Sequence, residues 1–488
     1  MQNKVQLITY VDRLGGAGIS YLNELVKGPF KDLFGGVHLL PFFDPIDGQD
    51  AGFDPIDHTQ IDPRLGDWPN VLELGKTVDI MADLIVNHIS AKSGQFLDFM
   101  KKGEVSKYCD LFLTKEKVFP GGGSEEEISQ IYRPRPGLPF TKFQFADGTI
   151  KTLWTTFTAN QIDMDVASKA GMAYLERILD TFQKAGISMI RLDAAGYAVK
   201  KRGTSCFMIE ETFDFISQLA NKAKKRGMEV LVEIHSFYRT QIQIAERVDY
   251  VYDFALPVLV LDTLFNKDAT HLGKWLAIAS RNVITVLDTH DGIGIVDVAS
   301  ESGRPGLIPD PILDGIVEKI HKNSGGTSLK ATGAAASNLD LYQVNCTYFE
   351  ALGKNKKAYL IARAIQFFAP GIPQVYYVGL FAEGNDMVLL GKTNVGRDIN
   401  RHYFTKDEIL KQTKSDWFSA FTELIHFRNA HPAFKGKFHL IEAKKGILKL
   451  KWTHRDHWAQ LSIDLVVLEG SITFSKDTGQ GTLALSKF

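Results

Sequence analysis

The segment AGMAYLERILDTFQKAGISMIRLDAAG at 170–196 combines one predicted helix and one predicted strand. In its first part the apolar residues fall on one helical face, and these are Met172, Leu175, Ile178, Leu179 and Phe182. Its second part, ISMIRLDAAG at 187–196, is a short β-rich run that is apolar on both faces. Such strands are typical of a parallel sheet covered by helices. The segment therefore predicts one helix–strand unit of an α/β fold.

Seven further runs of this kind occur along the chain, and segments with helical periodicity lie between most of them. The runs are VQLITYV at 5–11, GVHLLPFF at 36–43, DIMADLIVNH at 79–88, MEVLVEIHS at 228–236, YVYDFALP at 250–257, VITVLDTHDG at 283–292 and IPQVYYVG at 372–379. Eight parallel strands with right-handed crossovers are most economically a closed (β/α)8 TIM barrel. A doubly wound open sheet is the alternative fold.

Two connections, after the third and the seventh predicted strands, are too long for a plain link between a strand and a helix. We therefore predict two inserted subdomains, at 87–167 and at 293–353. The barrel itself would be built from three parts of the chain, at 1–86, 168–292 and 354–433.

The last part of the chain follows a different pattern. After the helical segment DWFSAFTELIHFRNA at 416–430 come the alternating runs KFHLIEA, ILKLKWTH, WAQLSID and GSITFS, with turn signals between them. Alternation of this kind is typical of antiparallel strands with one solvated face. The pattern predicts a small antiparallel β domain at 434–488.

The composition excludes several classes of protein. Lys and Arg number 56 against 57 Asp and Glu, which gives a formal net charge of −1, and the two signs are mixed along the whole chain. Nucleic acid is therefore not expected as a partner. With 44% hydrophobic and 23% charged residues, the chain matches an ordinary globular protein and not a disordered one.

The cysteines and the first residues point to the cytoplasm. Cys109, Cys206 and Cys346 are an odd number and lack the spacing of a metal site, so at least one thiol stays free and a reducing compartment is expected. The start, MQNKVQLITYVD, lacks the pattern of an export signal. No apolar run is long enough to cross a bilayer, so we expect no membrane partner.

Charged or imidazole side chains follow four of the predicted strands. They are in Asn87-His88, Arg191-Leu192-Asp193, Glu233-Ile234-His235 and Asp288-Thr289-His290-Asp291. The carboxyl ends of the strands surround the active site of a TIM barrel. We therefore expect an active site on this rim.

The carboxylates on this rim predict a retaining glycosidase type of chemistry. Arg191 and Asp193 project from the same face of a strand, so the guanidinium is expected to lower the pKa of Asp193, as suits a nucleophile. Glu233 follows an apolar run with no adjacent cation, so burial is expected to raise its pKa, as suits a proton donor. Retaining chemistry needs such a pair about 5 Å apart. Asp291 would stabilise the positive charge that develops on the sugar.

Other interpretations exist for each of these residues. Asp193 could belong to a buried ion pair, Glu233 could cap a helix, and His88 and His290 could be core histidines. A metal-dependent barrel hydrolase is the rival class, but the first strand offers no His-x-His pair and the last no carboxylate.

A third class is a carbohydrate-binding protein without catalysis. Such a protein could use aromatic stacking platforms, for which Phe53, Tyr132, Phe157 and Tyr197 are the candidates. It would have no need for two carboxylates in opposed environments. The carboxylates therefore favour an enzyme over a binding protein.

The strand-end motifs resemble those of a known superfamily. DLIVNH (83–88), RLDAAGY (191–197), EIHS (233–236) and LDTHDG (287–292) resemble, in order, the four strand-end motifs of the α-amylase superfamily. Longer stretches over most of 1–430 resemble the bacterial sucrose phosphorylase family, including NKVQLITYVDRLG (3–15), IYRPRPGLPF (131–140), AASNLDLYQVN (335–345) and GRDINRHY (396–403).

The resemblance implies a set of site residues. Asp193 would be the nucleophile, Glu233 the acid/base and Asp291 the transition-state stabiliser. The glucose pocket would comprise Asp50, Phe53, His88, Phe157, Gln161, Arg191, His290 and Arg397. The residues facing fructose or phosphate would be Tyr132, Arg135, Tyr197, His235, Asp340, Leu341, Tyr342 and Gln343.

The resemblance also implies what else the site takes. Asn87 occupies a position that binds calcium in many α-amylases, but sucrose phosphorylases lack that calcium site, so no metal is expected. No cofactor is implied, and inorganic phosphate is a co-substrate. The family further suggests a homodimer.

The implied reaction is the reversible phosphorolysis of sucrose to α-glucose 1-phosphate and fructose. It would run by double displacement through a β-glucosyl ester of Asp193. The alternatives are a phosphorylase of sucrose 6′-phosphate, glucosylglycerol or glucosylglycerate, and a sucrose hydrolase or transglucosidase. The segment DLYQ at 340–343 resembles the sucrose-specific version.

Overall fold

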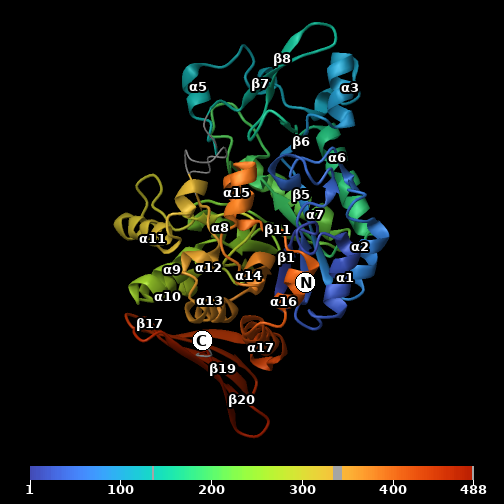
Figure 1. Cartoon of the computed structure of the whole chain (residues 1–488). Coiled ribbons are helices and arrows are strands. Elements are labelled where there is room, and N and C mark those ends of the chain that lie inside the picture. The colour runs from blue at the N-terminus through green and yellow to red at the C-terminus, as the bar shows by residue number, and fades with distance from the viewer. Residues whose placement is uncertain (135–136, 333–342, 486–488) are drawn as a thin grey trace.

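The computed structural model describes residues 1–134, 137–332 and 343–485. Its centre is a closed barrel of eight parallel strands in the order β1-β16-β13-β12-β11-β10-β5-β2 (Figure 1). Their bounds are β1 (Gln6–Thr9), β2 (Gly36–Leu39), β5 (Asp79–Ile85), β10 (Met189–Asp193), β11 (Glu229–Val232), β12 (Tyr250–Asp253), β13 (Val283–Thr285) and β16 (Ile372–Tyr376). Each strand lies within one of the eight predicted runs. The predicted (β/α)8 barrel is therefore confirmed, and the open sheet is excluded.

Helices surround the barrel, and the predicted helical segments begin where a capping side chain precedes them. Ser168 accepts a hydrogen bond from the amide of Gly171 at the start of α6, and Ser415 does the same for Phe418 at the start of α17. The helices are α1 (Gly18–Lys27), α2 (Trp68–Gly75), α6 (Lys169–Lys184), α7 (Glu210–Lys224), α8 (Tyr238–Ala245), α9 (Ala255–Asn266), α10 (Thr270–Ile278), α13 (Lys356–Phe368), α14 (Tyr377–Leu380), α15 (Met387–Thr393), α16 (Lys406–Gln412) and α17 (Asp416–Ala430).

One predicted strand is shorter than its apolar run. The run at 250–257 forms β12 only as far as Asp253, and α9 begins at Ala255. The Asp253 carboxylate accepts a hydrogen bond from the amide of Leu256 at 3.0 Å, which satisfies a free donor in the first turn of the helix. Every residue of α9 from Ala255 to Thr263 is buried, so this helix is apolar on all sides and its sequence resembles a strand.

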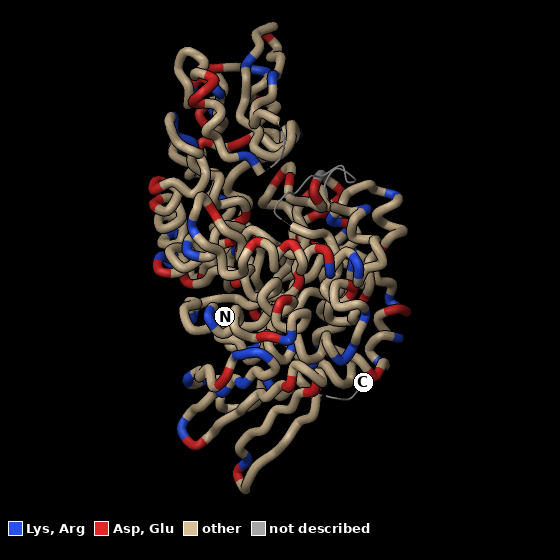
Figure 2. Tube along the Cα trace, turned by 90° about the vertical axis from the view of Figure 1, so that its left-hand side faces the viewer, with Lys and Arg blue, Asp and Glu red and all other residues tan. Residues whose placement is uncertain are grey.

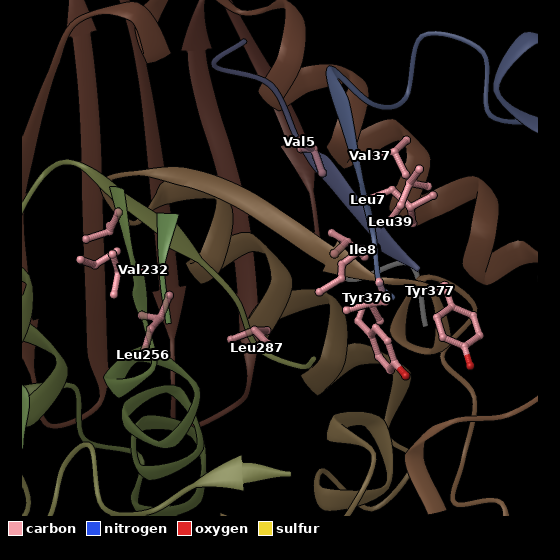
Figure 3. Close-up of a cluster of buried hydrophobic side chains, with 14 of the residues drawn as sticks. Val5, Leu7, Ile8, Val37, Leu39, Val232, Leu256, Leu287, Tyr376 and Tyr377 are labelled. Atoms are coloured by element: carbon pink, nitrogen blue, oxygen red, sulfur yellow. The ribbon is translucent and has the colours of Figure 1, made fainter. Parts of the chain in front are cut away.

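The hydrophobic core fills the barrel wall and the layer beneath the helices. Figure 3 shows Val5, Leu7 and Ile8 of the first strand region beside Val37 and Leu39, and all five are buried. Burial of each such side chain contributes about 1.5–3 kcal/mol. The core thus holds the strands rigidly and fixes the positions of the residues at their carboxyl ends.

The first long connection carries its own small elements and projects from the barrel at the top of Figure 1. β6 (His88–Ser90) pairs with β9 (Gln161–Asp163), and β7 (Phe140–Gln144) pairs with β8 (Ile150–Trp154), both antiparallel. The short helices here are α3 (Gly94–Lys102), α4 (Lys115–Val118) and α5 (Glu125–Ser129).

The second long connection holds α11 (Asp310–Asn323) and α12 (Tyr348–Ala351), and its β14 (Ile293–Gly294) pairs with β15 (Gln343–Val344). Both connections leave the barrel where the sequence predicts insertions. The domain boundaries at 87–167 and 293–353 stay a prediction.

After α17 the chain forms a five-stranded antiparallel sheet, which confirms the predicted C-terminal β domain. Its strands are β17 (Lys437–Lys444), β18 (Ile447–His454), β19 (His457–Asp464), β20 (Glu469–Ser475) and β21 (Gln480–Ala484). The sequence predicts only the first four. β21 is short and partly exposed, and its pairing with β20 defines it more than its apolar content does.

Lys, Arg, Asp and Glu are interspersed over the whole trace (Figure 2), as the composition indicates. Among the described residues, no helix has both the length and the apolar character that a membrane span requires.

Candidate active site

A pocket with an empty volume of about 760 Å³ lies at the carboxyl ends of the barrel strands. Asp193 is the last residue of β10, Glu233 directly follows β11, and Asp291 lies in the segment after β13. Most of the predicted site residues line this pocket: Asp50, Phe53, His88, Tyr132, Phe157, Gln161, Asp193, Tyr197, Glu233, His235, His290, Asp291 and Arg397. The fold therefore brings together side chains that lie up to about 350 positions apart in the sequence.

Arg191 lies beneath the pocket and is almost fully buried. One of its terminal nitrogens lies 2.5 Å from an oxygen of Asp83 and 3.1 Å from an oxygen of Asp193, and the other contacts Glu233. Its guanidinium carbon also lies 5.4 Å from the centre of the Phe53 ring. One guanidinium group thus contacts three carboxylates.

This sharing overturns the prediction that Asp193, and not Glu233, lies beside a cation. The sequence predicts a cation beside Asp193 alone, but Arg191 contacts both residues. Burial raises the pKa of Asp193 well above its ordinary value, Arg191 opposes this, and the charges of Glu233, Asp83 and Asp291 add to it. The expectation that Arg191 keeps the pKa of Asp193 low is therefore wrong, because one guanidinium group is divided among three carboxylates.

Asp83 is the member of this group that keeps its charge. Burial alone would raise its pKa, but Arg191 and His38 outweigh burial and lower the pKa to about 2. His38 contacts the second oxygen of Asp83 at 3.1 Å. Asp83 therefore stays ionised beside Arg191.

Asp291 has the opposite environment. Its Oδ1 lies 2.7 Å from a terminal nitrogen of Arg397. Burial raises the pKa of Asp291, but the charges of Arg397, His290, Arg401 and His235 together lower it far below its ordinary range. Asp291 therefore stays an anion, as a residue that stabilises a cationic transition state requires.

One end of the pocket is narrow and polar. The Phe53 ring stacks on His290 with centroids 5.1 Å apart, and His88 contacts the Phe53 carbonyl at 2.9 Å and the Gln161 amide nitrogen at 3.0 Å. Asp50 and Ala51 both have left-handed backbone angles, with φ of 50° and 53°. Such strain in residues other than glycine is typical of binding sites, where it orients a side chain toward a ligand.

The other end of the pocket is aromatic. Tyr132 stacks on Phe207 with centroids 4.4 Å apart, and Phe207 lies 4.7 Å from the Tyr197 ring. Tyr132 is 40% exposed and so marks the mouth of the pocket. The sequence analysis misses Phe207, which lies in the segment GTSCF at 203–207. Ala194, Gly196 and Ile234 also line the pocket without having been predicted.

Several predicted residues lie elsewhere. Gln343 is outside the pocket lining, where its side-chain oxygen accepts a hydrogen bond from the amide of Gly292 at 3.1 Å. It therefore supports the segment that carries Asp291. Four further predicted residues lie outside the described part of the chain, and these are Arg135, Asp340, Leu341 and Tyr342.

A buried ammonium group lies where the sequence raises the question of calcium. Lys200 Nζ lies 2.6 Å from Asn87 Oδ1 and 2.6 Å from Asp163 Oδ2, and it also contacts the Tyr197 carbonyl. The side chains of Lys200 and Asp163 are essentially buried. Oxygen atoms around a cation are the pattern of a calcium site, and here a lysine supplies the charge. The expectation of no metal at Asn87 stays a prediction, and this ammonium gives it a physical basis.

Lys200→Met should destabilise the protein by about 3–5 kcal/mol, since it leaves the buried Asp163 carboxylate without its counter-charge. Chemical denaturation would measure the loss. The matched control is Lys201→Met, because the neighbouring lysine makes only an exposed ion pair with Glu211 and should change stability by less than about 1 kcal/mol. Equal stability of the two variants would contradict this role.

Among the described residues, Glu233, His235 and Asp291 each place one possible ligand atom within 4.8 Å of the others. Two guanidinium groups already lie against this group, since Arg191 contacts Glu233 and Arg397 contacts Asp291. Alternating carboxylates and guanidinium groups suit a neutral ligand with many hydroxyl groups, which can both donate and accept hydrogen bonds.

The barrel and the carboxylates at its rim define an enzyme of the α-amylase class that acts on glycosidic bonds. Residues 30–249 match the family model described as the alpha amylase catalytic domain. The chain is 59% identical to the sucrose phosphorylase of Agrobacterium vitis over 97% of this chain and 98% of that protein. It is 50% identical to the sucrose phosphorylase of Bifidobacterium adolescentis, over 95% and 92% of the two chains. The chain belongs to the sucrose phosphorylase family.

A solved structure agrees over the whole chain. The crystal structure of sucrose 6F-phosphate phosphorylase from Thermoanaerobacter thermosaccharolyticum superposes with a TM-score of 0.91 at 38% identity, covering 99% of this chain and 98% of that one. The fold described above is therefore that of a known phosphorylase.

Proposed function

We propose that this protein catalyses the reversible phosphorolysis of sucrose to α-D-glucose 1-phosphate and D-fructose. The observation that carries the proposal is the similarity to two sucrose phosphorylases at 59% and 50% identity over nearly the full length. The relative known as a sucrose 6F-phosphate phosphorylase is more distant, at 38% identity. Sucrose is therefore the favoured substrate over its 6′-phosphate.

The first step of the proposed reaction is attack by Asp193 on the anomeric carbon of glucose. The bond to the fructose oxygen breaks, and Glu233 donates a proton to that oxygen. The geometry supports this assignment, because Arg191 contacts both Asp193 and Glu233 and so holds the two carboxyl groups close to each other at the rim of the barrel.

In the second step Asp193 is the leaving group and Glu233 is the base. Phosphate attacks the glucosyl ester of Asp193 while Glu233, now a carboxylate, accepts the phosphate proton, and α-glucose 1-phosphate leaves with retained configuration. Asp291 stabilises the oxocarbenium character of both transition states. Water competes with phosphate for the same ester, which makes hydrolysis the side reaction.

The polar end of the pocket is the proposed glucose site and the aromatic end the proposed site for fructose and phosphate. Asp50, Arg397 and His290 offer charged and polar atoms to glucose hydroxyl groups, while Phe53 offers a ring face. Tyr132, Phe207 and Tyr197 form the wall that fructose would meet.

We further propose a cytoplasmic location and a homodimer. Cys109, Cys206 and Cys346 are all free thiols, which favours a reducing compartment. Light scattering coupled to size-exclusion chromatography tests the dimer, and a mass of one chain would exclude it.

One assay tests the proposed activity and its alternatives. The enzyme is incubated with sucrose with and without inorganic phosphate, and then with sucrose 6′-phosphate and with glucosylglycerol. We expect glucose 1-phosphate to form fastest from sucrose and only when phosphate is present. Faster release from an analogue would assign the enzyme to that substrate, and free glucose as the main product at saturating phosphate would make it a hydrolase.

A further inference from the structure

His235, which lines the pocket beside Glu233 and Asp291, is held by a carboxylate that does not line the pocket. Asp297 Oδ2 lies 2.9 Å from His235 Nδ1, and Asp297 Oδ1 accepts a hydrogen bond from the amide of Ser236 at 3.2 Å. Asp297 is 1% exposed. A carboxylate only accepts hydrogen bonds, so Nδ1 carries a proton and the second ring nitrogen, Nε2, is the one left to titrate.

Two neighbours fix the orientation of this ring. The His235 imidazole stacks on Phe254 with centroids 3.9 Å apart and an angle of 15°. Gly294 packs so closely against the edge of the ring that faces Asp297 that a Cβ there would lie 2.5 Å from Asp297 Oδ2 and 3.0 Å from His235 Nδ1. Gly294 pairs with Gln343 across β14 and β15. The stacking on Phe254 and the close packing of Gly294 therefore hold the ring against Asp297.

The other histidines of the pocket lack such a partner. Of the three that line it, only His235 has a carboxylate oxygen within hydrogen-bond distance of a ring nitrogen in the described residues, since His290 lies 3.6 Å from Asp291. Burial lowers the pKa of all three. For His290 the pKa falls to about 3, whereas for His235 the charges of Asp297, Glu233 and Asp291 outweigh burial and raise it.

The groups that face His235 are therefore predominantly acidic. Glu233 lies with His235 in the segment that directly follows β11, Asp291 comes from the segment after β13, and Asp297 lies beyond β14. Phe254 and Gly294 add only apolar or backbone surface. Three carboxylates around one imidazole favour its protonated form.

We propose that Asp297 is a positioning residue that holds His235 as a cation for binding inorganic phosphate. This inference rests on the proposed function. When fructose leaves, Asp193 is a neutral ester, but Glu233 has become an anion by giving up its proton and Asp291 is still one, so both repel phosphate. An imidazolium beside them offsets this repulsion and donates an Nε2 hydrogen bond to a phosphate oxygen. Water needs no such cation, so the pair selects phosphate over water.

The test is the product ratio of Asp297→Asn, which keeps the size of the side chain and removes its charge. Glucose 1-phosphate and free glucose are measured from sucrose at sub-saturating phosphate across a range of pH. We expect the KM for phosphate to rise about tenfold near neutral pH and the product to shift toward glucose.

The pH profile separates this role from a structural one. A histidine charge is present below its pKa and is lost as pH rises through it. Because the asparagine variant lowers the pKa of His235, its preference for phosphate should decline at a lower pH than in the wild-type enzyme. Phosphate ionises identically with both enzymes. The product ratio of the variant divided by that of the wild-type enzyme at each pH therefore reports the ionisation of His235.

A matched control exists outside the pocket. Asp262 Oδ2 lies 2.8 Å from His271 Nδ1, between α9 and α10, and Asp262 is equally buried. Asp262→Asn removes the same type of pair and should lower stability while leaving the product ratio and its pH profile unchanged.

A double variant decides whether Asp297 acts through His235. His235→Gln alone should reproduce the shift toward glucose and remove the pH dependence of the ratio, and Asp297→Asn should add nothing in that background. An additional loss of the same size in the double variant would overturn the proposal. If Asp297→Asn fails to fold, an unchanged product ratio in His235→Gln overturns it instead. Formation of glucose 1-phosphate by the wild-type enzyme is measured first, so failure of the proposed function is recognised separately.

Discussion

Asp193→Asn will lower both phosphorolysis and hydrolysis of sucrose by about 10⁴-fold or more, because both reactions pass through the same glucosyl ester. Fructose release measures cleavage under either condition. The variant keeps the shape of the side chain, so its melting temperature should stay close to that of the wild-type enzyme. A residual rate of even a tenth of the wild-type value would remove Asp193 from the role of nucleophile.

The ester itself can be detected in the wild-type enzyme. After a rapid acid quench with sucrose and without phosphate, mass spectrometry should find a fraction of the protein heavier by one glucosyl residue. The modified peptide should contain Asp193, and Asp193→Asn should show no such species. A label on another carboxylate would reassign the nucleophile.

Glu233→Gln will affect the two donors very differently. Fructose leaves as a poor alkoxide and needs a proton, whereas phosphate leaves glucose 1-phosphate as a stable anion and needs little help. We expect formation of the glucosyl enzyme from sucrose to fall by about 10²–10⁴-fold, and formation from glucose 1-phosphate to fall much less.

Quenched single-turnover experiments with each donor provide the measurement for Glu233. The donor comparison is an internal control, because a general disturbance of the pocket would slow both reactions alike. Equal losses with the two donors would count against Glu233 as the acid.

The sequence predicts the barrel well because periodicity is local. The spacing of apolar residues within each element indicates which of its side chains are buried. This holds for the eight apolar runs and for the helices predicted at 170–186 and 416–430, and the structure confirms these elements. The convergence of Asp193, Glu233 and Asp291 also follows from the sequence, since the carboxyl ends of barrel strands meet at one rim.

What the sequence cannot predict are contacts between residues far apart along the chain. Arg191 reaches Asp83 across 108 positions, His235 reaches Asp297 across 62, and Lys200 reaches Asn87 across 113. The direction of the pKa shift of Asp193 cannot be predicted for this reason, because it depends on Asp83, Glu233 and Asp291 as well as on the neighbouring Arg191. β21 cannot be predicted for a related reason, because its pairing with β20 and not its own apolar pattern defines it.

Because Lys200 is part of the chain, it differs from a bound metal ion in how it responds to the composition of the medium. A bound metal ion is lost when the medium is diluted or contains a chelator, whereas an ammonium group on the chain has a local concentration fixed by its covalent attachment. The link from Asn87 to Asp163 is thus assembled by folding alone. We therefore expect the junction between the barrel and its first long connection to form without a supply of divalent ions, because its cation belongs to the chain.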